Sequence, residues 1–318
     1  MNFSISIIIC TRNRAERLRS TLQSISKATV PQHWTVELLV VDNGSTDGTQ
    51  AVVMEAQLSN MNLRYINEPM TGQSHARNTG LRETSGEAVL FTDDDIRVPS
   101  NWVVAMCEPI LTGAAHAVAG AVIFPDEYSG VFSRPGLSSR QSWFASTHEL
   151  DPHHPGRMVG SNMAFHRRIL DKCPEFDVEL GPGALGFGDE TLFSSQLLAA
   201  GYKLAAVFDT SVEHYFDLTR LTREALLDAA RKMGRSHAFV FHHWEHQRSR
   251  LVFPRLMLCL WRRYWAQRSE RNLDKMPNRI FDRLLQLETE LAFYREYIVQ
   301  RRREFKYPRC GLAPLQAK

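Results

Sequence analysis

The chain has 318 residues, of which 43% are hydrophobic and 23% are charged, and this balance is ordinary for a soluble globular protein. The formal net charge of +3 is too small for the chain as a whole to be a nucleic-acid-binding protein. No uncharged stretch reaches the roughly 20 apolar residues that a membrane-spanning helix needs.

The first 125 residues alternate between strand-like and helix-like segments. Short Ile- and Val-rich runs are typical of buried strands, and the segments between them place apolar residues at helical spacing. We expect strands at 5–10, 36–41, 63–66, 88–92 and 117–124, and helices at 13–27, 48–58, 74–83 and 101–111. This alternation predicts an α/β fold whose mainly parallel central sheet is covered by helices on both faces.

The remainder of the chain changes character twice. Residues 129–157 are rich in Pro, Gly, Ser and His without a period, which predicts a long loop. Two further strands, at 158–165 and 202–207, flank a helix at 189–200. Helical periodicity then continues through 222–241, 253–268 and 279–303. We expect a catalytic domain at 1–218, with a nucleotide-binding half (1–125) and an acceptor-binding half (126–218), followed by a helical region (219–318).

Polar residues follow three of the predicted parallel strands. Thr11, Arg12, Asn13 and Arg14 follow the first strand, Asp42 follows the second, and Asp93, Asp94 and Asp95 follow the fourth. Ligands of open parallel sheets bind at the carboxyl ends of the strands, so these side chains should face one crevice. Three adjacent carboxylates favour a divalent cation, and Mg²⁺ and Mn²⁺ both prefer carboxylate oxygens. The competing interpretation is a solvated acidic turn or a helix cap.

Three further signals lie downstream. Arg77 stands one turn into a helix that begins after Gly72, where it can hold a phosphate or simply lie on the surface. Asp189 and Glu190 begin a helix, where one can act as a general base or both can merely cap it. His214 can complete a metal site or be structural. Four more histidines, at 237, 242, 243 and 246, are interpreted as a helix surface and not as a zinc site.

The ordered motifs resemble glycosyltransferase family 2, whose members have the GT-A fold. Residues 7–14 are similar to its opening strand and T-x-N-R turn, and 40–49 are similar to its VVDDGSTDGT segment. The segments 72–80, 91–95, 159–165 and 188–191 resemble its G-x-S-x-A-R-N-x-G segment, its aspartate-rich metal motif, its acceptor-side strand and its G-E-D-T motif. The resemblance covers about residues 3–216.

The resemblance implies a metal-assisted, inverting transfer of a sugar from a nucleotide-diphosphate sugar, with UDP-sugar as the default donor. It implies that Asp42 and the 11–14 turn contact the nucleobase, that Asp93 reaches the ribose or the metal, and that Arg77 supports the nucleotide. Asp94 and Asp95 would hold Mn²⁺ or Mg²⁺ on the diphosphate, with His214 as a further ligand. Asp189 or Glu190 would be the base.

Two departures leave alternatives open. The Glu-Asp order of the family is reversed at 189–190, and one residue turns a helix position by about 100°, so either carboxylate remains a candidate base. The acidic triplet is the second departure, because its spacing does not tell which of Asp93, Asp94 and Asp95 ligates the metal. The reversed pair makes a catalytically inactive nucleotide-binding relative a second hypothesis. A nucleotidyltransferase is a third, although the turn after the first strand lacks the glycines of a phosphate loop.

The basic, aromatic region from residue 219 allows two interpretations. Its helices can pack as a bundle that forms a homo-oligomer interface, or they can lie on a membrane that carries anionic lipid. The N-terminus lacks the order of a signal peptide, because Arg12 and Arg14 follow the apolar run instead of preceding it. The five cysteines have no metal-site or redox spacing, so we expect reduced thiols in a cytoplasmic protein. The membrane interpretation of the helical region would make this protein membrane-peripheral.

Overall fold

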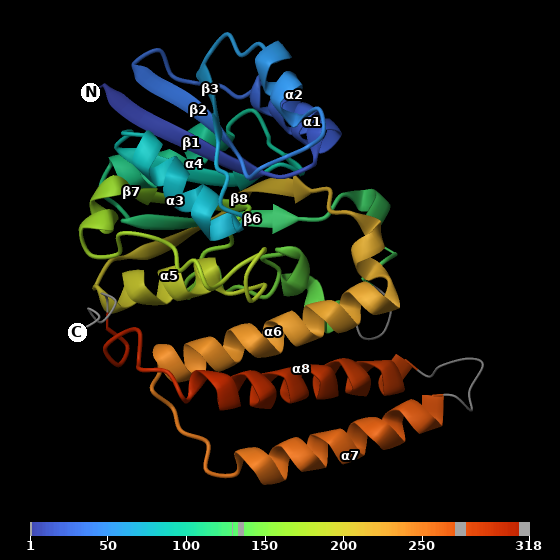
Figure 1. Cartoon of the computed structure of the whole chain (residues 1–318). Helices are drawn as coiled ribbons and strands as arrows, with labels where there is room; N and C mark the ends of the chain where they lie inside the picture. The colour runs from blue at the N-terminus through green and yellow to red at the C-terminus, as the bar shows by residue number, and fades with distance from the viewer. Residues whose placement is uncertain (1, 129, 133–136, 271–277, 312–318) are drawn as a thin grey trace. The chain divides into compact units, whose positions relative to one another are not determined.

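The computed structural model describes residues 2–128, 130–132, 137–270 and 278–311. The strands are β1 (Phe3–Thr11), β2 (Trp34–Asp42), β3 (Asn62–Asn67), β4 (Ala88–Asp93), β5 (Ile96–Arg97), β6 (Ala117–Ile123), β7 (Asn162–His166) and β8 (Leu204–His214). They form one sheet in the order β3-β2-β1-β4-β7-β6-β8-β5 (Figure 1). Its helices are α1 (Ala15–Ile25), α2 (Thr49–Glu55), α3 (Gln73–Glu83), α4 (Trp102–Leu111) and α5 (Asp189–Ala199).

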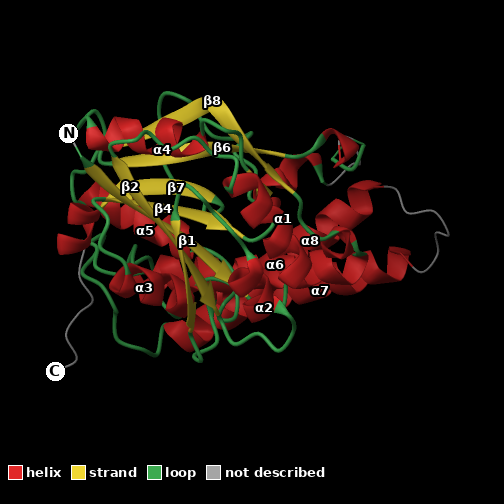
Figure 2. Ribbon diagram, turned by 90° about the horizontal axis from the view of Figure 1, so that it is seen from above, coloured by secondary structure: helices red, strands yellow, loops and turns green. Residues whose placement is uncertain are grey.

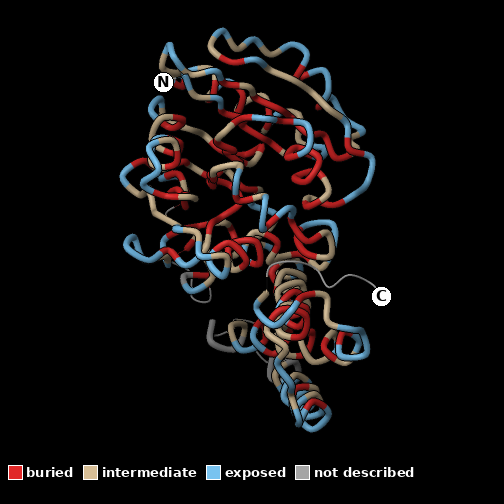
Figure 3. Tube along the Cα trace, turned by 90° about the vertical axis from the view of Figure 1, so that its left-hand side faces the viewer, coloured by how far each residue is buried: buried red, intermediate tan, exposed pale blue. Residues whose placement is uncertain are grey.

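Helices cover both faces of the sheet, as expected (Figure 2). On one face of β1, Ile5, Ile7 and Ile9 join a buried cluster that includes apolar residues of α1 and α4. On the other face, Ile8 packs so closely against α3 that a Cβ on Gly80 would lie 2.6 Å from its side chain. The near-continuous apolar sequence of β1 follows from this double coverage. Strands β1, β4, β6 and β7 are buried along most of their length, whereas β3 contains no buried residue (Figure 3).

The sheet is mainly parallel, as expected, but it also contains antiparallel pairs. β1 pairs in parallel with β2 and β4, β2 with β3, and β6 with β8. However, β7 runs antiparallel to both β4 and β6, and β5 runs antiparallel to β8. A parallel neighbour needs a crossover connection, usually helical. The segment between β6 and β7 contains no α-helix among its described residues, and β7 enters the sheet in the opposite direction.

The bounds of two predicted strands differ from the structure by more than two residues at one end. β7 begins at Asn162 and not at residue 158, and β8 extends to His214 beyond the predicted end at residue 207. The polar residues 209–211 interrupt the apolar pattern, and this interruption concealed the extension. In the structure, β8 pairs with β6 on both sides of a register shift, and its end pairs with β5. The predicted loop at 129–157 contains a short 3-10 helix, Ser138–Phe144, and its residues 129 and 133–136 lie outside the described residues.

The described residues group into two compact units. Unit 1 contains the sheet and α1–α5, and its segments are Met1–Asp126, Phe144–Val178 and Asp189–Phe216. Unit 2 combines Glu127–Trp143 and Glu179–Gly188 with Asp217–Lys318. Its main elements are α6 (Arg223–His243), α7 (Val252–Glu270) and α8 (Asn278–Gln300).

Within unit 2, α8 lies between α6 and α7 (Figure 1). A Cβ on Gly234 of α6 would lie 2.1 Å from the carbonyl oxygen of Thr289, so glycine permits the close approach of α6 to α8. The expectation that the α6 histidines form a surface is corrected for two of them. His242 and His243 are buried. The Nε2 atom of His242 lies 3.1 Å from the Arg303 carbonyl oxygen, and that of His243 lies 2.9 Å from Gln300 Oε1.

Among the described residues, no helix has the length and apolar character required to cross a bilayer. All five cysteines lie in the described part of the chain, and all are free.

Candidate functional site

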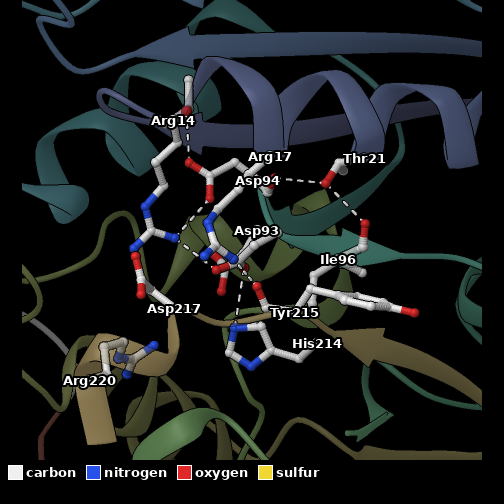
Figure 4. Close-up of polar contacts among 12 residues, drawn as sticks. Arg14, Arg17, Thr21, Asp93, Asp94, Ile96, His214, Tyr215, Asp217 and Arg220 are labelled. Atoms are coloured by element: carbon white, nitrogen blue, oxygen red, sulfur yellow. Dashed lines mark hydrogen bonds and ion pairs between the residues drawn. The ribbon is translucent and has the colours of Figure 1, made fainter. Parts of the chain in front are cut away.

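The acidic turn after β4 lies beside the end of β1. Pairing of Cys10 with Asp93 places the turn next to Thr11, whose hydroxyl donates to Asp94 Oδ2 at 2.7 Å. The Arg14 guanidinium lies 3.2 Å from Asp94 Oδ1 and 2.7 Å from Asp95 Oδ2 (Figure 4). A positive charge therefore lies between two of the three carboxylates.

Residues of α1 and the residue that follows β8 hold the backbone of this turn. The Thr21 hydroxyl lies 2.7 Å from the carbonyl oxygen of Asp94 and 2.9 Å from that of Ile96 (Figure 4). The Tyr215 amide donates to the Asp95 carbonyl at 2.8 Å, and Arg17 donates to the Tyr215 carbonyl. These contacts fix the backbone that carries the carboxylates.

His214, at the end of β8, faces the same carboxylates. Its Nδ1 lies 2.7 Å from the Phe144 carbonyl oxygen, which can only accept, so Nδ1 carries the proton. Its Nε2 lies 3.2 Å from Asp95 Oδ1, and both side chains are almost fully buried. In a neutral imidazole with this tautomer, a lone pair on Nε2 faces a carboxylate. A proton or a metal cation between the two atoms removes that conflict.

Burial makes the acidic turn costly without a cation. It raises the pKa of Asp94 to about 7, with Asp95 adding to the effect and Arg14 opposing it. Burial also raises the pKa of Asp93. Among the described residues, no three His, Cys, Asp or Glu side chains are already gathered as a metal site. The oxygens of Asp94 instead contact Thr11 and Arg14. The residue types and the tautomer of His214 nevertheless fit a divalent cation, since metal-bound histidines commonly donate their other ring N–H to a carbonyl.

Asp42, at the end of β2, belongs to a second polar group. Its Oδ1 accepts from the Ser45 amide at 2.8 Å and its Oδ2 accepts from the Tyr65 hydroxyl at 2.9 Å. The turn after β1 is tied to the same loop, because Asn13 Oδ1 accepts from the Thr46 amide at 2.7 Å. Asn13 has a positive φ of 54°, and Arg12 is exposed.

Gly72 begins α3 at the edge of this polar group. Its φ is 136°, a value that favours glycine, and its amide donates to Asn43 Oδ1 at 2.8 Å. Asn43 Nδ2 in turn donates to the carbonyls of Glu68 and Met70. The loop before α3 is therefore fastened to the end of β2.

The third centre joins α3 to the start of α5. Arg77 forms an ion pair with Asp189, and its Nη1 lies 3.8 Å from Glu190 Oε2. Arg77 also lies over the Phe176 ring at 5.3 Å. A Cβ on Gly160 would lie 2.0 Å from Arg77 Nη2, so only glycine leaves room for the guanidinium.

The two carboxylates of this centre differ in environment. The Asp189 side chain is 1% exposed, whereas that of Glu190 is 24% exposed. Burial opposes ionisation of Asp189, yet the Arg77 guanidinium holds its pKa below the ordinary value. Burial and the neighbouring Asp189 raise the pKa of Glu190 to about 8.

The acidic turn and the Arg77 centre flank the end of β1. The charges of Arg77, Asp93, Asp94 and Asp189 all act on the half-buried Cys10 thiol, whose pKa is raised to about 12 mainly by desolvation. Gln73 Nε2 also lies 3.5 Å from Asp93 Oδ1, which links the start of α3 to the acidic turn. The residues predicted from the strand ends therefore occupy neighbouring positions in unit 1.

Sequence reasoning missed several partners in this site. No sequence motif marks these partners. They are Tyr65, which donates to Asp42, Thr21, which donates to the backbone of the acidic turn, and the Phe144 carbonyl, which accepts from His214. Sequence reasoning also predicted that Arg77 contacts the nucleotide and did not predict its carboxylate partner, Asp189. One signal was available for Tyr65, because it lies in the strand that was predicted next after the strand ending near Asp42. In the structure these two strands are neighbours, and Tyr65 pairs with Val40, which lies two residues before Asp42.

The family described as Glycosyl transferase family 2 has a model that matches residues 6–173, just over half of the 318 residues. Glycosyltransferase AglE of Haloferax volcanii is 33% identical over 38% of this chain and 40% of its own length. The GalNAc(5)-diNAcBac-PP-undecaprenol beta-1,3-glucosyltransferase of Campylobacter jejuni is 30% identical over 42% of this chain and 43% of its own length. The chain thus spans about two fifths of these relatives.

Two solved structures share the architecture over most of the chain. The mannosyltransferase PcManGT from Pyrobaculum calidifontis, in complex with GDP-Man and Mn²⁺, covers 92% of this chain and 72% of its own with a TM-score of 0.54 and 19% identity. S. aureus TarS 1-349, in complex with UDP, covers 94% of this chain and 92% of its own with a TM-score of 0.53 and 16% identity. This likeness shows the fold, and the predicted GT-A fold is confirmed.

Proposed function

The chain belongs to glycosyl transferase family 2, and from this premise we propose that it transfers a sugar from a nucleoside-diphosphate sugar to an acceptor hydroxyl with inversion. The observation that carries the proposal is the pairing of two acidic centres beside the end of β1. One centre, at Asp93–Asp95, is suited to a metal-bound diphosphate, and the other, at Asp189 and Glu190, is suited to an acceptor.

The donor side is assigned to the ends of β1 and β2. Asp42, fixed by Ser45 and Tyr65, offers a carboxylate to the polar edge of a nucleobase. The turn Thr11–Arg14 closes the same edge, and Gly72 brings the backbone of α3 close to it. UDP is the default nucleotide. The solved relatives are described with UDP and with GDP-Man, so both nucleotides belong in the first test.

Asp94, Asp95 and His214 are the residues that would hold Mn²⁺ or Mg²⁺, with Asp93 reaching the ribose or the metal. A divalent cation bound there neutralises the charge of a diphosphate leaving group. Arg14 already supplies one positive charge to Asp94 and Asp95 and can turn toward the diphosphate. The Mn²⁺ of the solved mannosyltransferase supports the same choice of cation.

Glu190 is assigned as the general base. Its carboxylate is partly exposed, and a raised pKa makes it a better proton acceptor than an ordinary glutamate. Asp189 is buried against Arg77, which stabilises its charged form. Asp189 and Arg77 are therefore positioning residues that orient the start of α5.

In the transfer step, the acceptor O–H proton passes to the Glu190 carboxylate. The acceptor oxygen forms a bond to the anomeric carbon as the bond from that carbon to the diphosphate oxygen breaks. The electron pair of the broken bond leaves with the nucleoside diphosphate, whose new negative charge lies near Arg14 and the acidic turn. Attack opposite the leaving group inverts the anomeric centre.

The test is a thermal-shift panel of UDP, GDP and thymidine diphosphate, each with Mn²⁺ or with EDTA. A ligand at 100 times its dissociation constant contributes about 2.7 kcal/mol if it binds only the folded state. We expect one nucleotide to stabilise the protein with Mn²⁺ only, and Asp95→Asn to abolish that shift while Glu190→Gln retains it. If no nucleotide stabilises the protein under either condition, the proposal fails.

A further inference from the structure

Helix α7 in unit 2 carries apolar residues on two opposite faces. Its inner face meets the neighbouring helices, where Val252 packs with Ala238 and Tyr297. On the same face, Arg263 Nε lies 2.5 Å from Glu288 Oε1 of α8. These contacts account for the docking of α7 within unit 2.

The outer face of α7 is also apolar and remains exposed. Its exposed side chains, with the fraction exposed, are Phe253 (62%), Met257 (62%), Leu258 (43%), Trp261 (61%), Tyr264 (55%) and Trp265 (49%). At about 100° per residue, positions 253, 257, 261 and 264 fall on one arc of the helix. A helix that is apolar all round is normally covered on every side, so this arc requires an explanation beyond the packing of unit 2.

Cations border the outer face. Arg255, Arg262 and Arg268 are exposed, and the Arg268 guanidinium lies 2.9 Å from the Tyr264 hydroxyl. The sequence of α7 contains a single acidic residue, Glu270, at its last position. Aromatic side chains flanked by arginines are typical of helices that lie in the headgroup region of a membrane.

We propose that the outer face of α7 docks on the surface of a bilayer that contains anionic phospholipid. The helix lies in the plane of the interface, with Phe253, Met257 and Trp261 inserted and the arginines among the headgroups. A second copy of the chain fits less well, because a two-fold contact through this face would bring identical arginine-rich surfaces together. The proposal does not depend on the catalytic proposal.

The test is flotation of the full chain with phosphatidylcholine vesicles, with and without phosphatidylglycerol. We expect binding to the anionic vesicles, weakened by salt. Replacing both Arg255→Gln and Arg262→Gln should lower the partition coefficient about fivefold for each arginine. The triple variant Phe253→Ser, Met257→Ser, Trp261→Ser should lower it about tenfold for each side chain.

Matched controls change equivalent residues elsewhere. Met54→Ser with Met70→Ser removes exposed apolar side chains from unit 1, and Arg301→Gln with Arg302→Gln removes two exposed charges. The controls should bind as the wild type does. The proposal is overturned if the wild type binds neither vesicle or if the triple variant binds undiminished. A vesicle-free dimer that the triple variant dissociates also overturns it, because that face then serves a second copy.

Discussion

At the scale of single residues, Asp189 and Glu190 illustrate how two adjacent carboxylates acquire different properties. Asp189 faces a guanidinium that is itself buried against Phe176 and Gly160, so its charge is balanced. Glu190 lies one position further around the helix, is more exposed, and receives the repulsion of Asp189. The same helix start therefore offers an anchor in Asp189 and, in our proposal, the general base in Glu190.

The raised pKa of Glu190 predicts the pH dependence of catalysis. A base works only when it is deprotonated, so kcat/KM should rise about tenfold per pH unit below a pKa of about 8 and level off above it. The measurement is the initial rate of nucleotide release as a function of pH. The substrate is a sugar donor that carries the nucleotide identified by thermal shift. A profile that is flat on the acid side, or one that Glu190→Gln leaves unchanged, contradicts the assignment.

Substitutions of the two carboxylates should separate their roles. Glu190→Gln should lower kcat by about two to four orders of magnitude while leaving the unfolding free energy nearly unchanged. Asp189→Asn leaves the buried Arg77 without its ion pair, and breaking such a pair typically costs about 3–5 kcal/mol of unfolding free energy. Urea unfolding and steady-state kinetics of both variants test this difference. If the roles were exchanged, Glu190→Gln would lose unfolding free energy, and Asp189→Asn would lose kcat without losing stability.

At the scale of elements, the contact of α6 with α8 depends on the absence of a Cβ atom at Gly234. Glycine inside a helix normally weakens it by about 1 kcal/mol relative to alanine. At Gly234, however, an added Cβ would lie 2.1 Å from the Thr289 carbonyl oxygen and 2.9 Å from the Phe293 nitrogen, so the helices would have to move apart. Packing thus outweighs helix propensity at this position.

We therefore predict that Gly234→Ala lowers the unfolding free energy of unit 2 by about 1–3 kcal/mol. The matched change His237→Ala, at an exposed position three residues away on α6, should alter it by less than about 0.5 kcal/mol. Urea unfolding followed by far-UV circular dichroism compares the two. Stabilisation by Gly234→Ala would mean that propensity governs this position.

At the scale of the whole molecule, the contacts that build the site join residues of unit 1, whereas α6–α8 belong to unit 2. Asp42, the acidic turn and the Arg77 centre come from segments that lie far apart in the chain, and the sheet brings them together. The exposed arc of α7 is a separate feature with its own proposed partner.

Hydrogen exchange should reveal the location of ligand binding. UDP or GDP with Mn²⁺ should slow exchange at residues 11–14, 42–46 and 93–95 and leave most of α7 unaffected. Adding EDTA should remove the protection if Asp94, Asp95 and His214 hold a divalent cation that the diphosphate needs, as proposed. Equal protection with EDTA would contradict metal-assisted binding.

The sequence by itself determined the family, the α/β class and the chemistry of the strand ends. Periodicity located most strands and helices, and the polar residues after β1, β2 and β4 lie in neighbouring positions because parallel strands end at a common edge. Those signals are local in sequence, and each can be read within a window of about a dozen residues.

Only the tertiary structure decided the direction of β7, the extension of β8, the partner of Arg77 and the difference between Asp189 and Glu190. Arg77 and Asp189 are 112 positions apart, and Gly160 makes room for their contact from a third segment. Burial and charge around a carboxyl group arise from all the segments that fold against it. The residue type indicated an acid, and the assembled surroundings determined how readily that acid holds its proton.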